Sequence, residues 1–96
     1  MDDLTETPLP PIHPGEVLVE EFLEPLGISQ YALAKAIGVD LPRIRAIAKG
    51  QRGITAHTAL RLAKYFGTSA EVWMNLQSRY DLSVQRVKLA DSLSIP

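Results

Sequence analysis

The sequence has no cysteine among its 96 residues, and this absence removes several classes of chemistry at once. Without thiols the chain can form no disulfide, no thiolate metal site and no thiol-based catalytic centre. It also has no His-Glu-x-x-His motif and no glycine-rich phosphate loop, so an enzyme is a poor interpretation of so short a chain. We therefore expect no catalytic residue, no cofactor and no metal.

Long hydrophobic runs are also missing. No stretch approaches the ~20 apolar residues that a membrane-spanning helix requires. The start of the chain is acidic and rich in proline, whereas a secretory signal is basic and then apolar. We predict a cytoplasmic protein, and its 46% of hydrophobic residues is enough for one packed domain.

Basic residues are absent from the first 28 positions, although the net charge of the whole chain is only −1. Residues 1–28 carry seven acidic side chains, whereas residues 29–68 carry seven basic side chains and one acidic one. A basic middle segment suits contact with phosphates, and an acidic start suits solubility or a basic protein partner. Charge alone leaves both interpretations open.

Strand alternation and internal repeats are absent, whereas apolar residues recur at helical spacing. The chain divides into a disordered, proline-rich arm (1–11), a helical domain (12–81) and a tail (82–96) of weak periodicity, for which a further short helix is expected. The capping residues Ser29, Asp40 and Thr68, together with glycines, predict five helices in the domain. They span Pro14 to about Leu26, Gln30 to Ile37, Leu41 to about Lys49, Thr55 to Phe66, and Thr68 to about Asp81.

The second and third of these helices form a motif. Ala34 is a small residue that allows two helices to approach closely, and Gly38 allows the sharp turn between them. The apolar residues that fill the angle are Leu33, Val39, Ile44 and Ile47. This pattern resembles the helix-turn-helix of the phage-repressor superfamily, the Cro or XRE type. The resemblance implies an all-α, five-helix fold that binds DNA.

In such a fold the second helix of the motif lies in the major groove. A rotation of ~100° per residue separates its buried side from an outward side that carries both Arg45 and Lys49. Arg45 suits guanine, the neighbouring apolar residues suit thymine methyl groups, and flanking basic residues suit phosphates. By resemblance, the start of the preceding helix touches the DNA backbone. The expected DNA-contact residues are Gln30, Tyr31, Leu41, Pro42, Arg43, Arg45, Ala46, Lys49 and Arg52.

Three residues at the start of this helix depart from the superfamily pattern. Leu41 and Pro42 stand where the phage repressors favour polar residues, and Asp40 adds a charge that DNA repels. Base recognition is therefore expected to be sparse, so that specificity depends on Arg45 and on DNA shape. The same departure supports an alternative, a protein-interaction module that has lost DNA binding.

The segments around the motif narrow the resemblance. They are Ile12–Leu23, Leu26–Gln30, Gly50–Thr55, Phe66–Gln77 and Tyr80–Leu82. Together they are similar to the HigA-type antitoxins, also called virulence-associated protein I. The resemblance implies a homodimer that represses its own operon at an inverted repeat and neutralises a HigB-like mRNA endonuclease toxin. A solitary XRE-type repressor without a toxin is the other alternative.

Several further side chains have a simple structural interpretation. We expect Trp73 in the core, His13 as a cap or loop residue and His57 on the surface. The basic residues expected to be solvated are Lys35, Arg61 and Lys64. Four glutamates, Glu16, Glu20, Glu21 and Glu24, form either a solvated face or a contact for a basic toxin. The tail is expected to supply a dimer contact through Val84, Val87 and Leu89.

Overall fold

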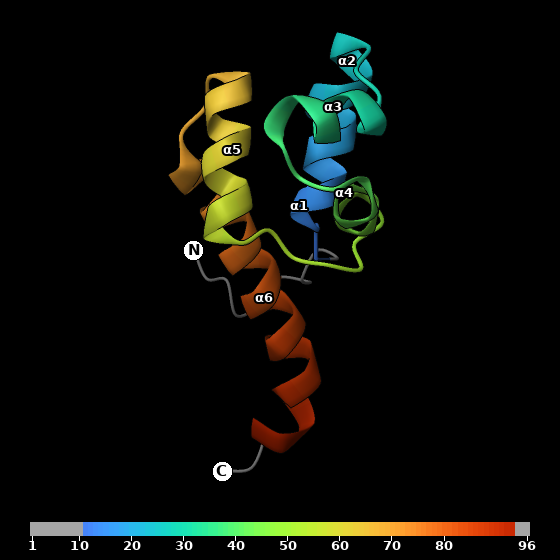
Figure 1. Ribbon diagram of the computed structural model, residues 1–96. Coiled ribbons are helices and arrows are strands. Elements are labelled where there is room, and N and C mark those ends of the chain that lie inside the picture. Colours follow the sequence, from blue (N-terminus) through green and yellow to red (C-terminus); the bar gives the residue numbers. More distant parts are fainter. Residues whose placement is uncertain (1–10, 94–96) are drawn as a thin grey trace.

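A computed structural model describes residues 11–93, with side chains for residues 11–90. This part of the chain forms helices and no strand (Figure 1). The elements are α1 (Pro14–Val17), η2 (Leu18–Leu23), α2 (Glu24–Leu26), α3 (Gln30–Ile37), α4 (Leu41–Ala48), α5 (Ala56–Phe66) and α6 (Ala70–Leu93). Because α1, η2 and α2 follow one another without a break, the fold has five helices, and the all-α prediction is confirmed. The predicted arm lies, apart from Pro11, outside the described residues.

The first helix begins with a histidine cap and ends at a glycine. The Nδ1 atom of His13 accepts a hydrogen bond from the Gly15 N–H at 2.8 Å, as expected for a cap residue. Pro25 lies inside the last turn, where it can donate no hydrogen bond and its ring would crowd the carbonyl four residues earlier. The six residues of η2, which end two positions before Pro25, are wound as a π-helix, so that the Glu24 N–H bonds the Val19 carbonyl five residues earlier. Gly27 then ends the helix with a φ of +66°.

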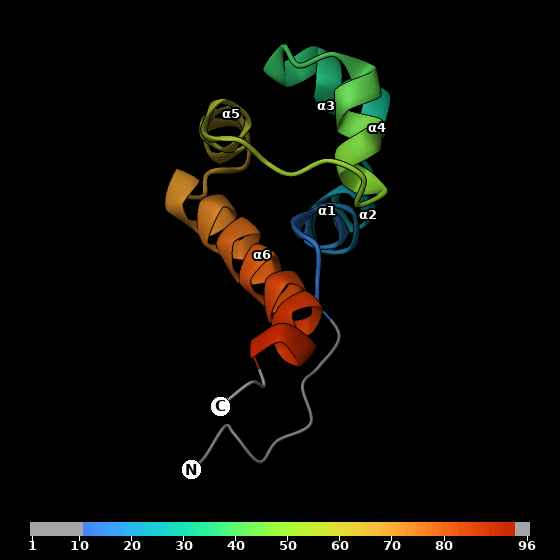
Figure 2. The same cartoon turned by 90° about the horizontal axis from the view of Figure 1, so that it is seen from below.

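The helix-turn-helix is built from local signals that the sequence shows. The Ser29 hydroxyl caps α3 and the Asp40 carboxylate caps α4, each by accepting a hydrogen bond from a backbone N–H three residues later. Gly38 joins the two helices with a φ of +73°, a conformation that side chains rarely allow. Figure 2 shows α3 and α4 crossing at a steep angle.

One hydrophobic core holds the five helices together. Trp73 of α6 is fully buried, and its ring lies 5.1 Å from that of Phe22, centroid to centroid. The other buried apolar residues are Leu18, Leu23, Leu33, Ala34, Ile37, Val39, Ile44, Ile47, Ile54, Ala59, Leu62 and Ala63. Leu26 and Val72, which their helical spacing predicts to face the core, are instead exposed. Each lies in the terminal turn of its helix, where fewer neighbours cover a side chain.

The last helix differs from its prediction at both ends. Thr68 was expected to cap it, but the Ser69 hydroxyl accepts the Val72 N–H, while Thr68 accepts the indole N–H of Trp73 at 2.8 Å. The helix was also expected to close at Tyr80 and Asp81, yet it continues to Leu93. The cause is visible in the sequence, because no glycine or proline occurs between positions 67 and 96. Its distal half projects from the body of the molecule (Figure 1). Within residues 11–93, no helix is long and apolar enough to cross a membrane.

Candidate nucleic-acid interface

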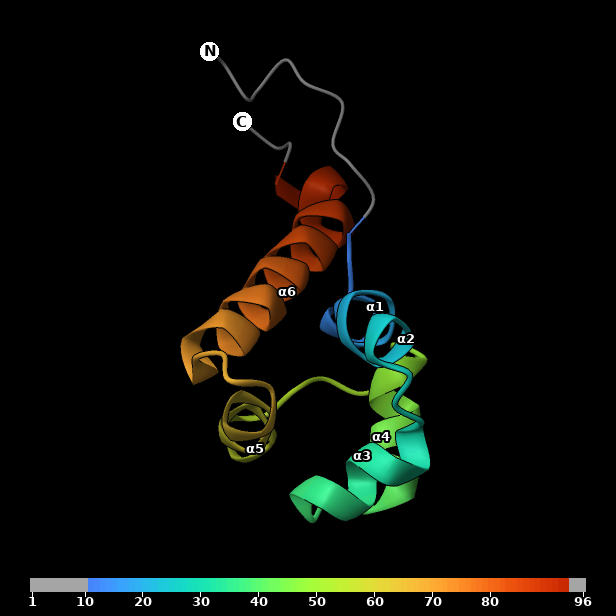
Figure 3. The same ribbon diagram turned by 90° about the horizontal axis from the view of Figure 1, so that it is seen from above.

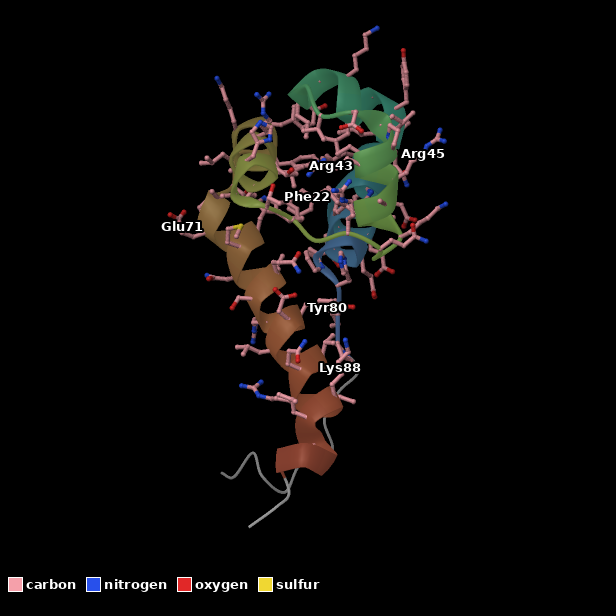
Figure 4. All side chains as sticks on the ribbon, turned by 60° about the horizontal axis from the view of Figure 1, so that its bottom comes forward. Phe22, Arg43, Arg45, Glu71, Tyr80 and Lys88 are labelled. Carbon is pink, nitrogen blue, oxygen red and sulfur yellow. The ribbon has the colours of Figure 1, made fainter. Side chains whose placement is uncertain are left out.

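The outward side of α4 is open to solvent. Ile44 and Ile47 fix the opposite side in the core, and both are fully buried. Pro42, Arg45 and Lys49 are all exposed, and Arg45 extends away from the body of the molecule (Figure 4). Figure 2 shows α4 at the rim of the fold with no other helix in front of it, and Figure 3, seen from the opposite side, shows α2 and α3 in front of α4. A duplex therefore has free access to these side chains.

Three other predicted contact residues on α4 are less available. Leu41 is half-buried and packs against the core, while Ala46 is half-buried on the edge of the outward side. The Arg43 guanidinium lies 4.0 Å from the Asp40 carboxylate, and its side chain is 33% exposed. Because this ion pair is solvated, it holds Arg43 only weakly. Arg43 can therefore exchange its carboxylate partner for a phosphate.

The remaining predicted residues flank α4 on both sides. Gln30 is half-buried at the start of α3, and Tyr31 beside it is 60% exposed. The ammonium group of Lys35 lies 5.8 Å from the centre of the Tyr31 ring. Lys35 thus has one more contact than the solvated position expected for it. Arg52 is exposed in the loop after α4. The predicted residues thus occupy neighbouring elements, α3, α4 and the following loop.

The first helix supports α4 from beneath. A Cβ atom on Gly15 would collide with the carbonyl oxygen of Ile47, so glycine is needed for α1 and α4 to approach this closely. Next to this contact, the ring of His13 packs edge-on against that of Tyr80, with centroids 4.7 Å apart. Burial lowers the pKa of His13, against opposing contributions from a backbone hydrogen bond with Arg52 and from the charge of Asp81. Neutral His13 keeps Nδ1 free to cap α1.

Two side chains that hold the motif were missed by sequence reasoning. Arg61, expected to be solvated, donates from Nη1 to the carbonyl oxygen of Ile37 at 2.7 Å. Gln77 accepts the Ile54 N–H at 2.6 Å. Each bond joins residues more than 20 positions apart, and no local pattern indicates such a pair. In the described part of the chain, no group of three or more His, Asp or Glu side chains is arranged to hold a metal ion.

Known proteins of similar sequence have the same helix-turn-helix motif. A helix-turn-helix family model matches residues 19–73. Virulence-associated protein I of Dichelobacter nodosus is 52% identical over 89 residues, which cover 92% of this chain and 82% of that protein. Antitoxin HigA-1 of Vibrio cholerae is 42% identical over 72 residues, which cover 75% of this chain and 68% of that protein.

Solved structures show the same fold. The antitoxin HigA of Pseudomonas aeruginosa, solved with the higBA promoter, is 48% identical and has a TM-score of 0.84, with 86% of this chain and 90% of that one covered. The antitoxin GraA in complex with its operator is 40% identical, also at a TM-score of 0.84, over 92% of this chain and 89% of that one. Both neighbours were thus solved with DNA, a promoter in the first structure and an operator in the second.

Proposed function

The chain belongs to the helix-turn-helix family of HigA antitoxins, and from this membership we propose that it binds the promoter of its own operon and represses transcription. The observation that carries the proposal is the open outward side of α4, where Arg45 and Lys49 are exposed beside Pro42. Similar antitoxins with the same fold are solved on promoter or operator DNA. Because promoter DNA in bacteria lies in the cytoplasm, we propose that compartment for this chain.

The roles of the nine contact residues follow from their positions. Arg45 donates two hydrogen bonds to guanine, while Pro42 and Ala46 contact thymine methyl groups. Phosphates are bound by the remaining polar and basic residues, which are Gln30, Tyr31, Arg43, Lys49 and Arg52. Leu41, half-buried, touches DNA only at its outer edge. With so few groups aimed at base edges, DNA shape supplies part of the specificity.

A homodimer completes this arrangement. Two copies joined through the distal half of α6 present two α4 helices to an inverted repeat, about 34 Å apart in successive major grooves. The apolar side chains that suit this contact are Leu82, Val84, Val87 and Leu89, of which only Val84 is half-buried. A dimer of this kind blocks access of polymerase to the promoter.

Salt dependence of promoter binding tests the DNA-binding function. The affinity for a duplex of the chain's own promoter is measured by fluorescence anisotropy between 50 and 200 mM salt, beside an unrelated duplex of equal length. If about six phosphates are bound, affinity falls on the order of a thousandfold over this range. The promoter should be bound far more tightly than the unrelated duplex. No binding at low salt would support the interaction module that has lost DNA binding.

Family membership also supports a toxin partner, an mRNA endonuclease that this chain neutralises. The exposed glutamates of the first helix, Glu20, Glu21 and Glu24 among them, give this surface a charge that attracts a basic ribonuclease. Replacing these three with Lys should abolish co-purification of the toxin encoded beside this gene, while promoter binding persists. Continued co-purification would refute this surface as the contact. A gene without a neighbouring toxin would instead indicate a solitary repressor.

A further inference from the structure

The turn before α4 is held by a side chain from outside the helix-turn-helix. Arg61 of α5 donates from Nη1 to the Ile37 carbonyl at 2.7 Å and from Nε to Nε2 of His57 at 3.1 Å. A Cβ atom on Gly38 would lie 3.0 Å from Nη1, so the guanidinium rests directly on this turn. The positive charge there also stabilises the carbonyl end of α3. Arg61 thus fixes the backbone turn that leads into α4.

The loop after α4 is held in a similar way from α6. The Gln77 amide oxygen accepts the Ile54 N–H at 2.6 Å, and its amide nitrogen donates to the Asp81 carboxylate at 2.9 Å. A Cβ atom on Gly53 would lie 3.0 Å from the side-chain amide of Gln77, which shows how closely the loop approaches α6. The hydrogen bond to Asp81 fixes the orientation of the Gln77 amide, and through the bond to Ile54 this amide holds the loop in place.

We propose that Arg61 and Gln77 are positioning residues for DNA recognition, which set the direction in which α4 presents Arg45. This inference rests on the proposed DNA-binding function. The eight residues of α4 are anchored in the core by Ile44 and Ile47 and rest on α1 at Gly15, and apolar packing of this kind is not directional. The hydrogen bonds of Arg61 and Gln77 are directional, and they hold the turn before α4 and the loop after it, so a tilt of α4 would strain one of them. Base recognition requires a placement within about 0.5 Å, so loss of either bond reduces it.

A positioning role is tested by the ratio of the affinity for the promoter to the affinity for an unrelated duplex of equal length. A small tilt of α4 misplaces hydrogen bonds to bases, while flexible contacts to phosphates adapt. We expect Gln77→Ala to lower promoter affinity about three- to thirtyfold, and affinity for the unrelated duplex by much less. Its matched control is Asn75→Ala, at an exposed amide on the same helix, which should change neither affinity.

Arg61 needs a variant that keeps its charge. In Arg61→Lys the single ammonium group cannot bond the Ile37 carbonyl and His57 as the guanidinium does, so the affinity ratio should fall with an unchanged salt dependence. The control is Lys64→Ala, which removes an exposed charge from the same helix. It should leave the ratio unchanged.

A double variant separates positioning from loss of stability. Gln77→Glu with Asp81→Asn keeps the total charge and an acceptor for the Ile54 N–H, while the introduced amide donates to the introduced carboxylate. Its affinity ratio should return to within about twofold of the wild-type ratio, a smaller change than the loss of one hydrogen bond produces. All ratios are measured below each variant's unfolding temperature, and if Gln77→Ala fails to fold, the double variant and Arg61→Lys decide.

Two results would overturn the proposals, and they are distinct. A wild-type ratio retained by both Arg61→Lys and Gln77→Ala would contradict the positioning roles and leave the DNA-binding function intact. A wild-type protein that binds the promoter no better than unrelated DNA would contradict the function itself. A reduced ratio in both variants, with recovery in the double variant, supports the positioning roles.

Discussion

The two halves of α6 belong to the same helix but face different surroundings. From Ala70 to Asp81 the helix packs against α1 and α5, with Trp73 fully buried. Beyond Asp81 it projects from the body of the molecule, and Val87 is 65% exposed. The proximal half therefore completes the core of a single chain, whereas the distal half has apolar side chains that the described part of the chain leaves uncovered. The uncovered apolar side chains of the distal half suit the dimer contact that we propose.

The largest effect is expected in the compact region, which is the part of the fold outside the distal half of α6, at the point where α1 and α4 approach each other most closely. Gly15→Ala places a methyl group against the Ile47 carbonyl oxygen, and the backbone of α1 or α4 must move to admit it. We expect the free energy of unfolding to fall by about 3 kcal/mol, measured by urea denaturation. In the projecting half, Val87→Ala should change the stability of the monomeric core by less than about 0.5 kcal/mol.

A glycine with open surroundings is the control for this clash. Gly27 has a φ of +66° and no atom within 4 Å of an added Cβ. Gly27→Ala should therefore cost only the strain of a left-handed backbone, about 1 kcal/mol. If the two alanine variants proved equally stable, the close approach of α1 to α4 would not be a determinant of the fold.

The second effect concerns the projecting half itself. Truncation after Asp81, or Val87→Asp in the full chain, should leave the core folded and yield a monomer by light scattering. Because two linked α4 helices bind far better than one, promoter affinity should fall about a hundredfold. A truncated chain that remains dimeric would assign the dimer contact to the compact region instead.

The smallest effect is the pH dependence of the compact region. Burial lowers the pKa of His13 below its ordinary value of 6.5, so the unfolded chain takes up a proton before the folded chain does. The stabilising contribution of neutral His13 is fully present above pH 6.5. It is lost as the pH falls below 6.5 towards the folded-state pKa.

The matched variant is His13→Asn, which keeps a side-chain cap and does not titrate. Thermal unfolding between pH 7 and pH 5 should show a steeper loss of stability in wild type than in the variant. Parallel curves would contradict a buried neutral His13.

The sequence predicts this fold wherever the determining signal is local. Ser29 and Asp40 cap their helices as expected, because a cap bonds a backbone group only a few residues away. The prediction of which side of α4 faces solvent is also correct, since the helical period follows from local geometry. The helix expected beyond Asp81 was predicted as a separate short element, whereas α6 continues through this position without a break, as the lack of glycine and proline there could have indicated.

Contacts between residues far apart in the sequence could not be predicted from local patterns. Arg61 and Gln77 carry no distinguishing pattern, and their partners lie 24 and 23 positions away. The burial of His13 likewise depends on Tyr80, which belongs to the other end of the fold. Such pairs are decided by how whole helices pack, and no window of neighbouring residues contains that information.

The most direct test of the account compares Arg45→Ala with Lys49→Ala, one turn apart on the exposed side of α4. Each variant is titrated against the promoter duplex, a series of single-base-pair variants of it, and unrelated DNA. Arg45→Ala should weaken promoter binding by about 1–3 kcal/mol and relax the preference at one base pair, whereas Lys49→Ala should weaken all sequences alike. Full promoter affinity and unchanged base preference in Arg45→Ala would contradict the claim that this side of α4 recognises DNA.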